Sequence, residues 1–157
     1  MNIFFLSRSP YDAAKYHCDK HVGKMLIESA QLLSTARIHY GFFAPYKLTH
    51  YNHPCAKWVR SAAGNYRWTL TLAYQLSYEY KHRFNKWHKT HFILDDLSVD
   101  VQHFKFPSHY FFDPPQAMPE EYYQDDPVKA YHDYYMFEKY HLLEYTNRDV
   151  PSWLCSA

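Results

Sequence analysis

One short segment holds most of the side chains in this sequence that could do acid–base or nucleophilic chemistry. His17, His21, Lys24 and Glu28 follow one another at spacings of three and four residues, and Lys20 borders the face that they would share. A helix places such residues on one face, so two imidazoles, two ammoniums and a carboxylate would lie together. Clustered groups of this kind shift one another's pKa values and can supply a base or an amine near neutral pH. We interpret these five as candidate catalytic residues; the alternative is an ordinary solvated face.

The two histidines of this segment also have the spacing of two metal ligands on one helix. Together with His53 and Cys55, His17 and His21 would form a nitrogen and sulfur ligand set suited to zinc or iron. Zinc proteases, however, place a Glu between the two histidines, where this chain has none, and the neighbouring lysines would repel a cation. We therefore predict no cofactor, with zinc or iron at these four residues as the alternative.

A second set of side chains has the composition of a nucleic-acid surface. Cations recur on one face of a predicted helix that begins at Pro54, and residues 81–89 interleave further cations with aromatic rings. Cations contact phosphates and aromatic rings stack on bases. The predicted nucleic-acid-binding residues are Lys57, Arg60, Arg67, Lys81, Arg83, Lys86, Trp87 and Lys89. No helix–turn–helix or zinc-finger pattern accompanies them, so sequence-specific recognition is not predicted.

The charge is divided unequally along the chain. Residues 1–91 form a basic half with a balance of +9, and residues 92–157 an acidic half with a balance of −8, which leaves the net charge of +1. Three explanations are open: the halves pair with each other, the basic half binds a polyanion such as DNA, or the acidic half shields the basic one. The 3 Gly exclude a glycine-rich phosphate loop.

Helical elements must position these side chains, because three helical patterns each begin with a proline in the first turn. They are predicted over 10–40, 54–84 and 127–147, with a short helix over 91–101. The predicted fold is mainly α, a single domain of three long helices plus the short one, spanning 1–157. An extended arm over 2–6, predicted to be buried under the helices, precedes them, and the Pro- and aromatic-rich segment 102–126 is predicted to wrap the core. Predicted core residues are Leu26, Leu33, Trp58, Tyr66 and Leu76.

The composition predicts an ordered globular protein. Hydrophobic residues make up 47% and charged residues 21%, which excludes intrinsic disorder, and the chain is unusually rich in aromatic residues and His. No apolar run has the length of a membrane span, and the 3 Cys form no disulfide pattern. We therefore expect a soluble protein of the cytoplasm with no membrane partner.

The order of these segments resembles that of the phage-type pyrimidine dimer DNA glycosylases. The resemblance covers about the first 90 residues: an N-terminal arm, a helix with a polar stripe, Tyr51-Asn52-His53-Pro54 at the start of a second helix, and the basic stretch Tyr80 to Lys89. The chain is also similar to a family of phage proteins that carry the segments Cys18-Asp19-Lys20-His21-Val22 and His53-Pro54-Cys55…Trp58-Val59-Arg60.

The resemblance implies a DNA repair enzyme, a hydrolase or lyase that cleaves at C1′ to excise a flipped base from damaged or modified DNA. It also implies an N-terminal amine as nucleophile and a Glu that stabilises the iminium. Met1 is normally removed only before small residues, which Asn2 is not, so Lys20 or Lys24 is an alternative amine with Glu28 as its carboxylate partner.

Two other functions stay open from the sequence. The first is a metal-dependent enzyme of nucleotide or small-molecule chemistry built on His17, His21, His53 and Cys55. The second is a non-catalytic phage-type binding protein whose acidic half occupies the nucleic-acid site of a host protein.

Overall fold

The structure, a computed structural model, describes residues 1–155 and is mainly α-helical, as predicted. No strand forms within that range, where one isolated bridge joins Ala62 and Ser108. The α-helices are α1 (Pro10–Tyr16), α2 (Asp19–His39), α3 (Pro54–Ser61), α4 (Ala63–Phe84), α5 (Leu94–Ser98) and α6 (Pro127–Glu138). Short 3-10 helices are η1 (Lys89–Ile93), η2 (Val101–His103), η3 (Glu120–Tyr122), η4 (Tyr140–Leu142) and η5 (Ser152–Leu154).

The three predicted helix starts are confirmed, because local side chains cap each of them. Ser9, His53 and Asp126 each accept a hydrogen bond from a backbone N–H of the first turn, and a proline follows each cap. This arrangement satisfies one of the free N–H groups at a helix start and uses the proline where its missing N–H costs nothing.

The lengths of the predicted helices are wrong. The first is broken at His17 and Cys18, which are both extended, and the second is broken at Ala62, with φ −154° and ψ 145°. At each break a distant segment supplies a hydrogen bond: the N–H of Asp19 donates to the carbonyl of Glu144 at 2.8 Å, and that of Ala63 to the carbonyl of Ser108 at 2.8 Å. These contacts replace helical hydrogen bonds, so the chain can change direction without a Gly or Pro.

The later elements are shorter than predicted. In place of one helix over 91–101, the chain forms η1, α5 and η2, and the left-handed Asp100 (φ 62°) separates the last two. The last long helix, α6, ends at Glu138 instead of near residue 147, and a mostly irregular tail follows it.

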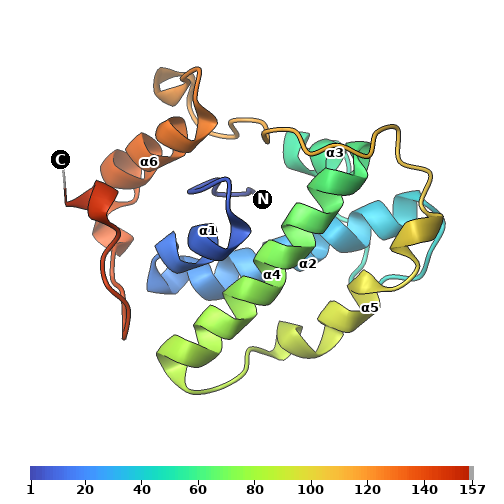
Figure 1. Cartoon of the computed structure of the whole chain (residues 1–157), viewed down its shortest axis with the longest axis horizontal. Helices are drawn as coiled ribbons and strands as arrows, with labels where there is room; N and C mark the ends of the chain where they lie inside the picture. The colour runs from blue at the N-terminus through green and yellow to red at the C-terminus, as the bar shows by residue number, and fades with distance from the viewer. Residues whose placement is uncertain (156–157) are drawn as a thin grey trace.

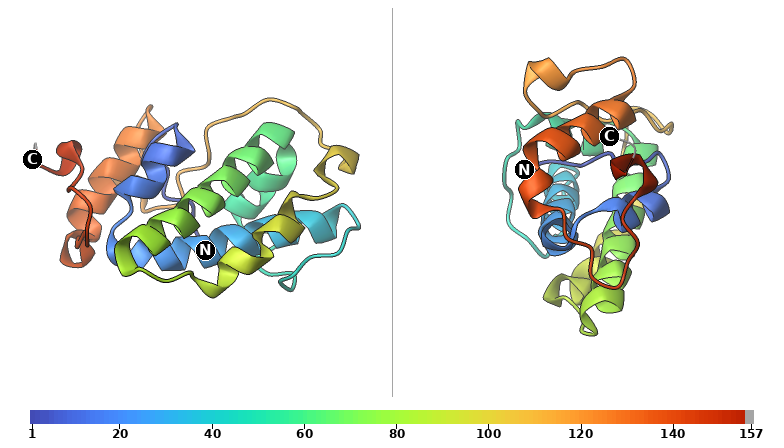
Figure 2. Two further views of the ribbon diagram at one scale, coloured as in Figure 1. Left: turned by 60° about the horizontal axis from the view of Figure 1, so that its bottom comes forward. Right: turned by 90° about the vertical axis from the view of Figure 1, so that its left-hand side faces the viewer.

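Helices α2 and α4 pack against each other and form the main layer, and the N-terminal arm lies between this layer and α6 (Figure 1, Figure 2). The arm is buried as predicted, since residues 3–6 are at most 5% exposed. The predicted core is also confirmed, because Leu26, Leu33, Trp58, Tyr66 and Leu76 are at most 8% exposed. The arm therefore places the first residue of the chain inside the fold, beside α2.

The Pro- and aromatic-rich segment wraps the outside of the α3–α4 junction on its way to α6, as Figure 1 shows. Two side chains hold it there: the indole Nε1–H of Trp58 donates to the carbonyl of Phe112 at 3.0 Å, and the carbonyl oxygen of the Asn65 side chain accepts the N–H of Phe112 at 2.9 Å. The prediction that this segment wraps the core is confirmed.

Candidate active site

The first two residues of the chain converge on the carboxylate of Glu28. The amine nitrogen of Met1 lies 3.8 Å from Glu28 Oε2, and the backbone N–H of Asn2 donates to the same oxygen at 2.9 Å. The side chain of Met1 is only 2% exposed, whereas the residue as a whole is partly exposed. The accessible surface of Met1 therefore lies on its backbone, which carries the amine, and the buried side chain holds that amine beside Glu28.

Asn2 fixes the direction of the arm at this point. Its side-chain Nδ2 donates to the carbonyl of Ala117 at 2.9 Å, and its Oδ1 accepts a hydrogen bond from the hydroxyl of Tyr131 at 3.0 Å. The wrapped segment and α6 thus both hold the start of the chain. A group held on rigid neighbours loses little freedom when it reacts, which favours catalysis.

His53 belongs to the same electrostatic cluster. Burial, and then the positive charge of the N-terminal amine, lower its pKa, while the carboxylate of Glu28 acts in the opposite direction. The ring Nδ1 accepts the backbone N–H of Cys55 at 3.1 Å. A neutral ring in this position carries its proton on Nε2, so His53 offers one hydrogen-bond donor at neutral pH.

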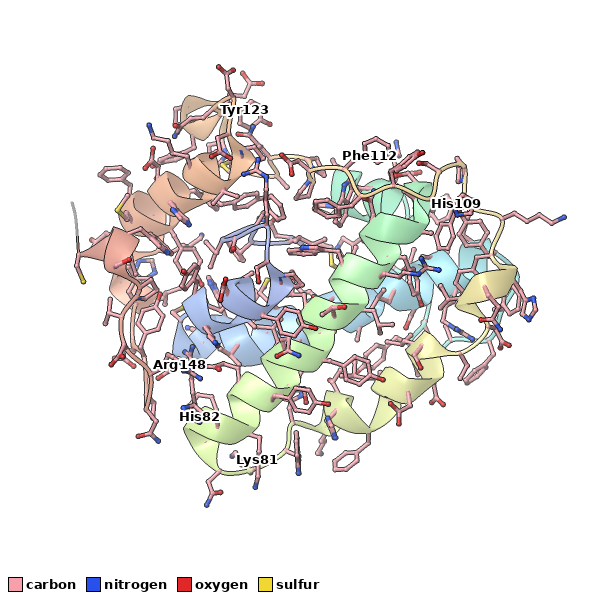
Figure 3. The ribbon with its side chains drawn as sticks, viewed as in Figure 1. Lys81, His82, His109, Phe112, Tyr123 and Arg148 are labelled. Carbon is pink, nitrogen blue, oxygen red and sulfur yellow. The ribbon has the colours of Figure 1, made fainter. Side chains whose placement is uncertain are left out.

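A cavity of about 900 Å³ adjoins this cluster. Its walls come from the start of α3, the wrapped segment and α6, and Figure 3 shows Tyr123 of this lining on the upper edge of the molecule. The lining residues are His53, Pro54, Asp113, Pro114, Pro115, Gln116, Ala117, Met118, Pro119, Tyr123, Asp125, Pro127 and Tyr134. Asn2 binds the backbone of Ala117, so the start of the chain lies directly behind one wall. The volume is within the range of sites for small molecules and nucleosides.

No protein-family model, curated protein or solved structure matches this chain.

The predicted catalytic residues do not share one face, because the helix break separates the first of them from the rest. His17 ends α1 and His21 lies in the first turn of α2, and both are buried. Lys20 and Lys24 are exposed on α2, and none of these four residues lines the cavity. Glu28 is the member of the predicted set that the structure places with the amine and His53, and it pairs with Met1 instead of Lys24.

The two buried histidines have structural contacts. His17 Nδ1–H donates to the carbonyl of Ala13 at 2.6 Å, and its buried Nε2 has no hydrogen-bond partner among residues 1–155. His21 hydrogen-bonds the hydroxyl of Tyr135 at 2.7 Å and stacks on Phe4 with ring centroids 4.6 Å apart. Burial lowers the pKa of His17 to about 4, and burial together with the charges of His17 and Lys24 lowers that of His21 to about 3. Both rings are therefore neutral at pH 7.

We expect the burial of His17 to make the fold acid-sensitive. The folded pKa of about 4 lies below the unfolded value of 6.5, so the stabilisation is complete above pH 6.5 and is lost as the pH falls toward 4. The loss from this one ring is about 3 kcal/mol. Urea unfolding at a series of pH values measures it, and the variant His17→Gln should show a shallower slope between pH 6 and 4.5. Equal slopes in the two proteins would contradict the prediction.

The predicted nucleic-acid-binding residues are mostly accessible. Lys57, Arg67, Lys86 and Lys89 are exposed, Trp87 is 39% exposed and Lys81 is partly exposed. Within residues 1–155, none of these lysines and arginines forms an ion pair with a carboxylate. Arg60 is held locally, because its guanidinium lies 3.9 Å from the ring centroid of Tyr51 and donates to the Tyr51 carbonyl.

Arg83 is the exception, and its prediction as a nucleic-acid contact is corrected. It is 2% exposed and forms ion pairs with Glu79 at 2.8 Å and Asp19 at 3.0 Å. Glu79, which also binds Arg148 at 2.7 Å, lies four residues before Arg83 on the same helix face. Arg83 therefore ties α4 to the start of α2 and has no free donor face for a phosphate.

The acidic half pairs with the basic half at a few positions. Arg8 binds Asp113 at 2.7 Å and Asp126 at 3.2 Å, and Arg37 lies 3.8 Å from Asp100. Mutual pairing of the two halves thus occurs, but it leaves the accessible cations named above unpaired.

The metal alternative finds no assembled ligand set in the part of the chain that the structure describes. No three His, Cys, Asp or Glu side chains gather there at metal-binding distances. Burial raises the pKa of the Cys55 thiol to about 11, which disfavours the thiolate form that metals bind. Over the same described residues, no helix combines the length and apolar character that crossing a membrane would require.

The amine of Met1 and most of the cavity lining were not among the residues predicted from spacing. The lining over 113–127 has no catalytic motif, and its proline and aromatic content predicted only a segment that wraps the core. The resemblance to the glycosylases was the one signal for an N-terminal amine, and no pattern in the sequence shows which carboxylate it meets.

Proposed function

We propose that this protein acts on DNA and excises a damaged or modified base, with the α-amine of Met1 as the nucleophile at C1′. One observation carries the proposal: the amine and the next backbone N–H both meet Glu28 Oε2, at 3.8 and 2.9 Å, beside a cavity large enough for a nucleoside. As a class, α-amines titrate more than two pH units below lysine side chains, so a larger fraction is uncharged and nucleophilic near neutral pH.

The reaction follows from the groups present. The amine lone pair forms a bond to C1′, the glycosidic bond breaks, and its electron pair goes to the departing base, which takes up a proton from water. The proton lost by the attacking nitrogen goes to the Glu28 carboxylate, 3.8 Å away, and from there to O4′ as the sugar ring opens and the iminium forms. Water then hydrolyses the iminium, or loss of a C2′ proton expels the 3′ phosphate, which is the lyase outcome.

Glu28 and His53 have separate roles in this scheme. The carboxylate takes up a proton and its negative charge stabilises the iminium cation. The Nε2–H of His53, in the cavity lining, donates a hydrogen bond to the leaving base or the sugar oxygen. The tyrosine and proline side chains of the lining offer flat apolar surfaces to an extrahelical base.

The accessible cations support DNA as the substrate. Lys57, Arg67, Lys86 and Lys89 are free of intramolecular ion pairs within residues 1–155 and can contact phosphates. The exposed Trp87 provides a ring for stacking.

Borohydride trapping tests the proposal, because borohydride reduces an iminium to a stable amine. We expect covalent capture of the protein on a duplex with an abasic site or on ultraviolet-irradiated duplex DNA, and peptide mass spectrometry should locate the link at Met1. The variants Lys20→Arg and Lys24→Arg are matched controls that keep the charge and should be trapped as efficiently as the natural chain. A Gly-Ser extension before Met1 should abolish trapping by moving the amine away from Glu28.

Two results would refute the proposal. One is a covalent link located at Lys20 or Lys24 instead of Met1. The other is the absence of trapping on both DNA substrates by a protein whose mass spectrum shows a free Met1 amine.

A further inference from the structure

The aromatic loop, residues 108–112, exposes more than half of two large aromatic side chains. Tyr110 is 77% exposed and Phe112 is 51% exposed. Phe111 between them is 37% exposed, because one side of its ring packs toward the core, with ring centroids 6.0 to 6.2 Å from those of Phe5, Trp58 and Trp68. Tyr110 and Phe112 therefore present more of their rings to solvent than Phe111 does.

The backbone of the aromatic loop is fixed at both ends. The carbonyl of Ser108 accepts from Ala63, and both polar groups of the Phe112 backbone are bound, to Asn65 and Trp58. The outward rings are thus displayed on a rigid backbone and cannot turn inward without breaking these contacts. Large rings held exposed in this way are typical of a surface that binds a partner.

The aromatic loop borders the candidate active site. Asp113, the next residue, lines the cavity, and α3 contributes both His53 to that lining and Trp58 to the hold on Phe112. Figure 3 shows Phe112 and Tyr123 along the same edge of the molecule, with the chain from 113 to 119 between them. A molecule that occupies the cavity therefore also meets the loop.

The charges around the aromatic loop suit a polyanion. Lys57 and Arg67 are exposed on the two helices that hold it, and Lys105 and His109 are exposed on the wrapped segment itself. The nearest acidic residue along the chain, Asp113, is paired with Arg8 at 2.7 Å. Exposed apolar rings on a segment that also carries cations match a nucleic acid, whose bases stack and whose phosphates are negative.

We infer that the aromatic loop is a wedge that enters the base stack of duplex DNA, next to the nucleotide whose base occupies the cavity; the inference rests on the proposed function for its substrate. Moving a base out of a duplex leaves a gap in the stack and costs a few kcal/mol. Apolar side chains inserted into the duplex fill such gaps and bend the DNA toward the protein. Tyr110 and Phe112 supply this filling, and the fixed backbone reduces the entropy lost on insertion.

The test uses a duplex with 2-aminopurine beside an abasic site, because the fluorescence of this base rises when it unstacks. The measurement uses the Glu28→Gln variant, which should bind the duplex without reacting. We expect its binding to give a clear rise in 2-aminopurine fluorescence. The double variant Tyr110→Ser/Phe112→Ser should lose the rise and bind the duplex at least tenfold more weakly. The matched control is Phe137→Ser on α6, an aromatic ring that is 63% exposed away from the cavity lining and should change neither value. Thermal melting of each variant checks that it is folded.

The outcomes separate this inference from the proposed function. Unchanged fluorescence and affinity in the folded double variant would overturn the wedge, whatever the trapping experiment shows. Loss of the fluorescence rise in the double variant alone supports the wedge, even if no covalent link forms at Met1. Equal losses in the double variant and in Phe137→Ser would overturn it, because the effect would then be general to exposed rings.

Discussion

Replacement of Glu28 by Gln is expected to lower the rate of borohydride trapping at least about a hundredfold, the usual scale for removal of an acid–base group. Glutamine has nearly the same shape, and its side-chain oxygen can still accept the N–H of Asn2, which lies 2.9 Å from the carboxylate. The arm therefore stays in place. The amide cannot take a proton from the attacking amine and carries no charge to stabilise the iminium. Single-turnover trapping on an abasic-site duplex measures the rate.

The matched control is Asp125→Asn, which removes an exposed carboxylate from the lining of the same cavity. This variant should react within a few-fold of the natural rate, because the Asp125 side chain lines the cavity but does not pair with the Met1 amine. The stability of Glu28→Gln should fall by about 1 to 3 kcal/mol, since the Glu28 side chain is only 14% exposed and loses its charge beside the amine. A natural trapping rate in Glu28→Gln, or an equal loss in both variants, would refute the role of Glu28.

The helix starts were predictable because the groups that create them are neighbours in the sequence. Ser9, His53 and Asp126 cap the residues that directly follow them. The helix breaks were not predictable, because the partners that stabilise them lie far along the chain. The carbonyls of Glu144 and Ser108 replace helical hydrogen-bond partners, and no residue close to either break in the sequence indicates these contacts.

The same distinction between local and distant contacts explains which residues of the candidate site could be predicted. Spacing identified Glu28, whose place on α2 is a local property, but it also grouped His17 with His21 across a break that a distant segment stabilises. Arg83 was predicted as a surface cation because its burial depends on residues that are distant in the sequence. In the folded chain Asp19 pairs with Arg83, and Arg148 pairs with Glu79. The amine of Met1 reaches Glu28 because the arm is buried, and hydrophobic character alone does not give the arm's direction.

Replacement of Gly64 by Ala is expected to destabilise the fold by about 3 kcal/mol or more. Gly64 lies in the first turn of α4. Replacing a helical Gly by Ala ordinarily stabilises the helix by about 1 kcal/mol. Here a Cβ would lie 2.5 Å from the backbone N of Phe111 and the backbone C of Tyr110. Backbone atoms cannot rotate away as a side chain can, so the aromatic loop must move and lose its bonds to Asn65 and Trp58.

Gly23→Ala provides the matched control for this effect. Its Cβ would meet the ring edge of Tyr80 at 3.2 Å, a contact that a small side-chain shift can relieve. Urea unfolding should therefore give Gly23→Ala a stability close to that of the natural chain and Gly64→Ala a clear loss. Because the displaced loop carries Tyr110 and Phe112, Gly64→Ala should also weaken binding to duplex DNA under conditions in which it is still folded. A Gly64→Ala variant as stable as the natural chain would show that the loop does not pack on α4 as closely as these distances require.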